Sequence, residues 1–219
     1  MRITKRFSWH PRSGDFAEKY FRKVYLPSLG LNFRKIRKDK KGSKPDGWIL
    51  LGKKKIALAE IKLITYNDRS ETAHKGVVKI TIDETIQHAI SSAKKQLKNI
   101  KTILPKILYL ILDDPFANSK SILDATFGPW ITVECAGKTV YNGQRGFHPR
   151  KKYPQDNKIL GDWLSAMLCL IPDTERYKLL LFRPQNSIKL PDKILPIETI
   201  EETWEYSENS LIQTKSNNN

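Results

Sequence analysis

Two acidic residues and a lysine lie close together between positions 46 and 62. Asp46 follows Pro45, and Glu60-Ile61-Lys62 comes after a gap of thirteen residues. Mg²⁺ prefers oxygen ligands and keeps several of its waters. A divalent cation also polarises a phosphate and lowers the pKa of a water bound beside it. Asp46, Glu60 and the backbone carbonyl of Ile61 are therefore predicted to hold Mg²⁺, which Mn²⁺ would replace, with Lys62 assisting the attacking water.

Two neighbouring strands are expected to bring these groups together. Residues 46–51 and 56–62 are typical of strands joined by a turn at Gly52 and Lys53. An antiparallel pairing centred near Lys53 puts Asp46 opposite residues 60–62. Side chains two apart on a strand share a face, so Glu60 and Lys62 point the same way. Lys62 is expected to orient the water, to steady the charge that forms at phosphorus, or to act as a base after its pKa is lowered.

The flanking sequence predicts the elements that hold this hairpin. A helix over residues 15–25 would turn Phe16, Tyr20 and Val24 to the core, and residues 31–37 alternate like a strand. Residues 63–80 form a polar connection, long enough for a flap. Thr81 and Glu84 form a capping box that opens a long helix, and a buried strand follows over residues 106–112. The apolar stripe of the long helix is Ile86, Ile90, Ala93, Leu97, Ile100 and Leu104.

This order predicts an α/β fold with a mixed central sheet flanked by helices, in the sequence helix, three strands, helix, strand. The chain is expected to form a single nuclease-like domain over residues 1–200, with its core at about 13–112 and an α/β elaboration at about 113–200. The elaboration is predicted to contain strands at 130–135 and 138–141, a helix at 157–170 and a last strand at 176–182. Residues 201–219 are polar and acidic and are expected to form a tail that frays after about 206.

The positive charge of the chain gathers in the half that carries the acids and Lys62. The formal net charge is +16, and residues 1–104 hold 25 Lys and Arg against 9 Asp and Glu. Such a field favours a polyanion and speeds its arrival. DNA is the expected partner, with RNA as the alternative and no membrane. Two cysteines without metal-ligand spacing and the absence of an apolar leader predict a reduced, cytoplasmic protein. The sequence leaves open whether the chain forms a homodimer.

Two groups of residues are candidates for binding the phosphate backbone. The loop from Arg34 to Lys44 holds seven Lys and Arg against one acid, directly before Asp46. On the long helix, a polar stripe lies beside the apolar one and is expected at the edge of the site. Both groups also fit a solvated surface. The candidates are Lys38, Lys40, Lys41, Lys44, Gln87, Lys94 and Lys98.

Pro45-Asp46 followed by Glu60-Ile61-Lys62 resembles the signature of the PD-(D/E)xK nuclease superfamily, which has a restriction-endonuclease-like fold. The order of elements over residues 13–112 is similar to the common core of that family. The resemblance implies that Asp46 and Glu60 bind the metal and that Lys62 supplies the catalytic positive charge. It also implies in-line attack of water on phosphorus with the 3′ oxygen leaving.

Glu18 extends the resemblance, because many members carry an additional acid in the first helix. It is a candidate for catalytic or water-holding duty, and an ion pair with Arg22 four residues later explains it equally well. Some DNA-repair members carry Gln-x-x-x-Tyr in the helix after the third strand, whereas this chain has Gln87 and then Ser91. The sequence thus predicts a Mg²⁺-dependent deoxyribonuclease, either endonuclease or exonuclease. The alternatives are a non-catalytic nucleic-acid-binding module of the same fold and a ribonuclease effector.

Overall fold

The computed structural model describes residues 18–37, 44–65, 70–74, 77–113, 118–144, 163–172, 177–184, 202–206 and 211–216, together with Leu190, Pro191, Ile194 and Ile200. The helical elements are a π-helical turn η1 (Phe21–Tyr25), α2 (Leu26–Ser28), α3 (Ile82–Lys98) and α4 (Ser119–Phe127). The strands are β1 (Asn32–Lys35), β2 (Gly47–Leu51), β3 (Lys54–Thr65), β4 (Ser70–His74), β5 (Val77–Thr81), β6 (Lys106–Asp113), β7 (Trp130–Cys135), β8 (Lys138–Gln144), β9 (Ala166–Pro172), β10 (Tyr177–Pro184), β11 (Glu202–Tyr206) and β12 (Leu211–Ser216).

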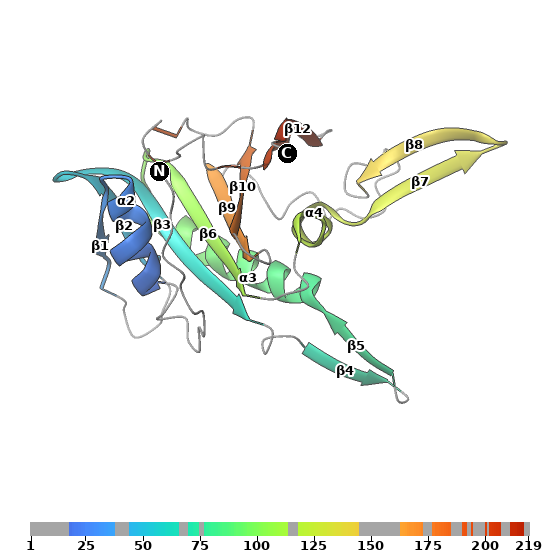
Figure 1. The fold of residues 1–219 in the computed structure, drawn as a ribbon, viewed down its shortest axis with the longest axis horizontal. Helices are drawn as coiled ribbons and strands as arrows, with labels where there is room; N and C mark the ends of the chain where they lie inside the picture. Colours follow the sequence, from blue (N-terminus) through green and yellow to red (C-terminus); the bar gives the residue numbers. More distant parts are fainter. Residues whose placement is uncertain are drawn as a thin grey trace.

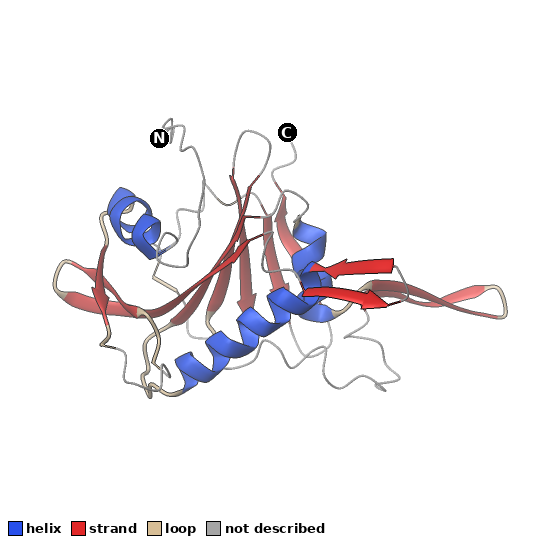
Figure 2. Cartoon of the chain, turned by 90° about the horizontal axis from the view of Figure 1, so that it is seen from below, coloured by secondary structure: helices blue, strands red, loops and turns tan. Residues whose placement is uncertain are grey.

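A mixed sheet forms the centre of the described part of the molecule (Figure 1). Its eight strands follow the order β1-β2-β3-β6-β9-β10-β11-β12. β1, β2 and β3 are antiparallel, β3, β6 and β9 are parallel, and β10 is antiparallel to β9 and parallel to β11. Figure 2 shows α3 along one face of the sheet and η1 with α2 on the other face. We call these the α3 face and the η1 face.

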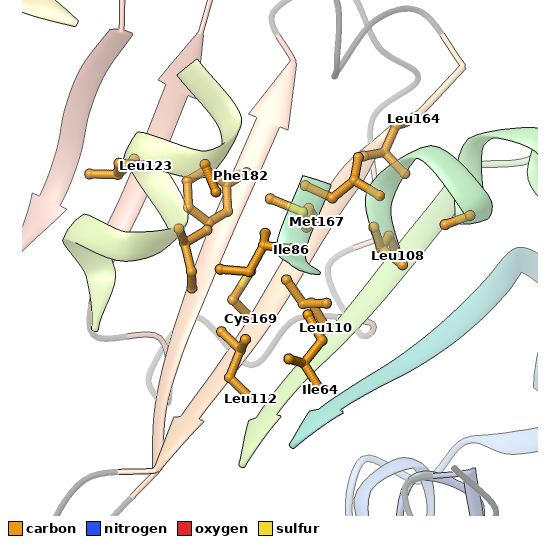
Figure 3. Close-up of a cluster of buried hydrophobic side chains, with 14 of the residues drawn as sticks. Ile64, Ile86, Leu108, Leu110, Leu112, Leu123, Leu164, Met167, Cys169 and Phe182 are labelled. Carbon is orange, nitrogen blue, oxygen red and sulfur yellow. The ribbon is translucent and has the colours of Figure 1, made fainter. Parts of the chain in front are cut away.

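The three parallel strands at the centre are buried on both faces, which explains why their sequences are nearly continuous apolar runs. Alternate residues of β6 enter two different clusters. Leu108 and Leu110 pack with Ile86 and Leu97 of α3, as Figure 3 shows for part of this cluster. Ile107 and its neighbours on the η1 face pack with Phe21, Leu26 and Leu31. The sheet therefore has a separate core on each side, and α3 closes the side that carries the candidate site.

The predicted fold class is confirmed. The chain forms a mixed α/β structure in which a helix, three strands, the long helix α3 and the strand β6 follow in the expected order, with the β4–β5 hairpin inserted before α3. The stripe of α3 is also confirmed at Ile86, Ile90, Ala93 and Leu97, whose side chains are fully buried. Ile100 and Leu104 lie beyond the end of the helix and are half-buried.

The first helix is only partly as predicted. Helical geometry runs from Glu18 to Ser28, and a π-helical turn interrupts it at residues 21–25. Residues five apart then share a side, so Phe21 and Leu26 enter the core whereas Tyr20 and Val24 are half-buried. The expected stripe at spacing four was therefore wrong, and Phe16 lies outside the described residues.

Two predictions in the second half are wrong. Residues 166–170 belong to strand β9 instead of the predicted helix at 157–170, whose first part lies outside the described residues. A short apolar run buried on both sides does not distinguish helix from strand by periodicity. The chain after residue 206 does not end in a frayed tail, because Leu211–Ser216 forms β12, which pairs with β11 at the edge of the sheet. The strand predicted at 176–182 is confirmed as β10 (Tyr177–Pro184), but it is not the last strand, because β11 and β12 follow it.

Two hairpins and one short helix complete the fold. The predicted flap at 63–80 begins with the end of β3 and continues as β4 and β5, which pair with each other. β7 and β8 form a second ribbon, and both hairpins project from the sheet in Figure 1. α4 was not predicted, although Asn118 caps it by accepting a hydrogen bond from the backbone N–H of Ser121 at 2.9 Å. In the described part of the chain, no helix has both the length and the apolar character that crossing a membrane needs.

Candidate active site

The pairing of β2 with β3 brings Asp46 and Glu60 to the same face of the sheet. Leu51 pairs with Lys54 across the turn, whereas Gly47 pairs with Ala59, because the register shifts by one residue between Ile49 and Leu50. Residues directly opposite each other share a face, so a one-residue shift exchanges the faces. Without this bulge, Asp46 would lie opposite Ala59, and Glu60 would point away from it.

Asp46 and Glu60 hold each other through the backbone. The backbone N–H of Asp46 donates to Oε2 of Glu60 at 2.9 Å, and the backbone N–H of Ile61 donates to Oδ2 of Asp46 at 2.9 Å. Asp46 is 7% exposed and Glu60 is 1% exposed. The next residue is a glycine for a steric reason, because a Cβ on Gly47 would lie 2.6 Å from the backbone oxygen of Arg34 on β1. The close approach of β1 thus fixes the backbone from which Asp46 projects.

Lys62 lies beside the carboxylates, as predicted, and a residue that the sequence did not single out holds it there. Its Nζ lies 2.7 Å from Oε1 of Glu60 and donates to Oε1 of Gln96 on α3 at 2.8 Å. Nε2 of Gln96 in turn donates to the backbone oxygen of Lys44 at 3.4 Å. Gln96 is buried. The signal that could have found it is a neutral polar side chain directly beside the apolar stripe of a helix.

Burial and the neighbouring carboxylate of Asp46 raise the pKa of Glu60 to about 7. The charge and hydrogen bond of Lys62 and the N–H of Asp46 oppose this shift without cancelling it. Two carboxylates brought together out of water disfavour the charged form of at least one. A cation bound between the two carboxylates would remove this penalty.

We expect the metal-free protein to lose stability as pH rises through this titration. Between about pH 4.5 and 7, the folded chain keeps a proton on Glu60 that the unfolded chain has released. The folded state therefore binds more protons, and its free energy of unfolding falls with rising pH by about 2 to 3 kcal/mol from this group. Urea unfolding in EDTA at pH 5 and pH 8 measures the change.

Glu60→Gln is the matched control, because it keeps an acceptor for the Asp46 N–H and does not titrate. The difference in unfolding free energy between wild type and Glu60→Gln should fall from pH 5 to pH 8, while titrations elsewhere affect both proteins alike. A difference that does not change with pH would mean that Glu60 titrates at its ordinary pKa.

The donor set fits a hard divalent cation. Asp46 and Glu60 supply buried carboxylate oxygens, and the Ile61 carbonyl faces the same side of β3 as the Ile61 N–H that binds Asp46. Mg²⁺ commonly takes one or two carboxylates and fills its other positions with water and phosphate. Within the described ranges, no three His, Cys, Asp or Glu side chains gather in a group able to hold a metal. Two protein carboxylates are thus the acidic ligands that this part of the chain offers.

Glu18 is not at this centre. Its Oε1 lies 3.2 Å from Arg22 and 2.7 Å from Nζ of Lys35. Lys35 pairs with Gly47 and therefore points to the η1 face, whereas Asp46 points to the α3 face. The structural alternative, an ion pair with Arg22, accounts for Glu18, and a catalytic or water-holding role has no geometric support.

The predicted polar stripe of α3 lies on the wrong flank of the helix for the edge of the site. At about 100° per residue, Gln96 falls about 90° to one side of the buried stripe, while Lys94 and Lys98 fall about 90° to the other. Gln87 shares the flank of the two lysines. Gln96 occupies the flank of α3 that contacts Lys62, so Gln87, Lys94 and Lys98 lie on the opposite flank of the helix.

The basic loop before Asp46 is described only in part. Lys44 is half-buried, and its backbone oxygen binds Gln96. Lys38, Lys40 and Lys41 lie outside the described residues. Arg34 pairs with Trp48 on β2, so it points to the same face as Asp46, and it is exposed. Lys44 and Arg34 thus bring positive charge to the neighbourhood of the two acids.

Comparisons with known proteins do not identify the chain. No family model, no curated protein and no solved structure matches it. The geometry of the site therefore carries the functional argument.

Proposed function

We propose that this protein is a Mg²⁺-dependent nuclease of the PD-(D/E)xK type that hydrolyses phosphodiester bonds of DNA. One observation carries the proposal: two buried carboxylates, Asp46 and Glu60, lie on one face of the sheet with the ammonium group of Lys62 at 2.7 Å from Glu60. Carboxyl groups with a shifted pKa beside a positive charge are common in catalytic sites. The net charge of +16 supports a polyanionic substrate.

Each residue has a defined task in this mechanism. Asp46, Glu60 and the Ile61 carbonyl would hold Mg²⁺, which supplies Lewis-acid polarisation of the phosphate and a more acidic water when bound. Lys62 presents a positive charge to the negative charge that develops on the phosphate oxygens during in-line attack. Gln96 is a positioning residue, since its amide oxygen fixes the direction of the Lys62 ammonium group.

The test compares DNA and RNA substrates side by side with Mg²⁺, with Mn²⁺ and with EDTA. We expect cleavage of DNA with either metal and none in EDTA. Cleavage of RNA but not DNA would favour the ribonuclease alternative. Salt-dependent binding without cleavage under any of these conditions would overturn the proposal and favour the non-catalytic binding module.

Replacing Gln96 with leucine should lower kcat for DNA cleavage by roughly 10-fold to 100-fold. This range is typical when a residue of a metal site loses the hydrogen-bond partner that orients it. The substitution keeps a side chain of similar size but removes the oxygen that accepts from Lys62. KM for DNA should change little, because Gln96 is buried. Steady-state kinetics with an unfolding curve for each protein makes the measurement.

Ser92→Ala is the matched control, because Ser92 Oγ reaches the same Gln96 oxygen only at 3.5 Å from the exposed side of α3. It should leave kcat nearly unchanged. A loss for Gln96→Leu that appears only in stability, with kcat intact, would show that Gln96 does not position Lys62.

A further inference from the structure

A second group of positive charges lies across α3 from the candidate active site. Lys94 and Lys98 are four residues apart and therefore adjacent on the helix surface. Lys106 begins β6 and alternates with Leu108, which is buried beneath α3, so its side chain lies on the α3 face. β6 lies on the side of β3 away from β2. These three lysines thus flank α3 opposite Gln96.

The fold holds these three ammonium groups together although they repel. Burial and the charge of Lys98 lower the pKa of Lys94, and the same two causes lower the pKa of Lys106. An anion placed among the three would relieve the repulsion, so the cluster is suited to a phosphate group.

The surface of α3 between this cluster and the candidate active site carries positive charge. The helix carries three lysines and one histidine between Ile86 and Lys98 and no acidic residue. Its outer side presents Ser91, Ser92 and Lys95, all exposed. The two flanks are separated by about 10 Å, the diameter of a helix. At about 3.4 Å per nucleotide along a strand, that distance corresponds to roughly three nucleotides.

We infer that Lys94, Lys98 and Lys106 anchor the phosphate backbone of the same nucleic-acid chain that reaches Asp46, Glu60 and Lys62, and that this chain crosses the outer side of α3. The identity of the polyanion rests on the proposed function. The consequence is a substrate class, because the protein would then act on polymers. Fragments of two or three nucleotides would gain no affinity from the three lysines.

The test is fluorescence anisotropy of a labelled 20-base-pair duplex in EDTA at several salt concentrations. We expect Lys98→Gln/Lys106→Gln to lower the slope of log affinity against log salt by about 2 and the affinity near 0.1 M salt by roughly 10-fold to 100-fold. The matched control is Lys53→Gln/Lys54→Gln. It removes the same charge from exposed positions at the other end of β2 from Asp46, and it should change the slope little.

Further measurements decide between the outcomes. The pKa of Lys106, followed by NMR, should rise when the duplex binds, and the double variant should bind a trinucleotide as well as wild type does. Equal losses of DNA affinity in the two double variants would overturn the anchor. So would an acidic peptide that binds more tightly than DNA and loses its affinity in Lys98→Gln/Lys106→Gln. Binding in EDTA needs no cleavage, so a protein that fails to cleave can still pass this test, and one that cleaves can fail it.

Discussion

Replacing Lys62 with methionine is expected to lower the rate of DNA cleavage by roughly 10²-fold to 10³-fold, the usual cost of removing one group that stabilises charge in a transition state. Methionine keeps most of the stem and removes the ammonium group that contacts Glu60 and Gln96. Lys62 also lowers the pKa of Glu60, so its loss raises that pKa further. Single-turnover cleavage should therefore be measured at pH 7 and at pH 9.

The high pH separates two explanations. Raising the pH to 9 ionises Glu60 in the wild type and favours its ionised form in the variant, so metal binding is expected to recover, and a loss of rate that remains reports the catalytic role of Lys62. Lys53→Met, in the exposed turn between β2 and β3, controls for lost charge and should cleave normally. Cleavage by Lys62→Met at the wild-type rate at pH 9 would show that Lys62 serves only to set the charge of Glu60.

Replacing Asp46 with asparagine should lower cleavage by roughly 10³-fold or more and weaken Mn²⁺ binding. The substitution removes one of two anionic ligands, although the asparagine oxygen can still accept from the Ile61 N–H. It should also shift the titration of Glu60 toward lower pH in the metal-free protein, because the charge of Asp46 helps to raise that pKa. Calorimetric Mn²⁺ titration and an NMR titration of Glu60 make the two measurements.

The change in the pKa of Glu60 is the internal control for Asp46→Asn, because it reports how close the two carboxyl groups lie without any metal present. If cleavage disappears while the titration of Glu60 stays at wild-type pH, the two carboxylates do not interact. The loss of activity would then come from a disturbed fold and not from a missing ligand.

The hairpin shows how a sequence can predict the right contact for an incomplete reason. Pairing centred near Lys53 predicts Asp46 opposite residues 60–62, and the observed register agrees. The turn itself pairs Leu51 with Lys54, however, and would place Asp46 opposite Ala59. An extra residue on β3, Ile56, forms a bulge opposite Ile49 and Leu50 and supplies the missing residue. Local sequence gives no sign of it, because bulges depend on how both strands pack.

α3 shows a second limit. Its apolar stripe is predicted correctly from Ile86 to Leu97, since the burial of these residues follows from helical periodicity alone. Periodicity does not say which flank of the helix faces which strand. That choice depends on the strand order β2-β3-β6 beneath the helix, a long-range property. The lysine stripe therefore lies on the flank of α3 toward β6, and nothing in the periodicity of the helix singles out Gln96.

The second half of the chain was predicted least well. β9 and the buried strand β6 have similar apolar runs, but the apolar pattern up to residue 170 predicts a helix. The polar segment of β11 and β12 looks like a tail because strands at the border of a sheet can carry few apolar residues, and it is held by the pairing of β11 with β10 and of β12 with β11. Propensity along the chain cannot report such pairings.

The most direct test of the central claim is the position of Mn²⁺ in crystals soaked with the metal, located by its anomalous scattering. We expect one strong peak at about 2.1 Å from carboxylate oxygens of both Asp46 and Glu60, close to the Ile61 carbonyl. A peak held by other residues, with Asp46 and Glu60 bound only to each other and to Lys62, would contradict a metal-dependent nuclease centre at this hairpin.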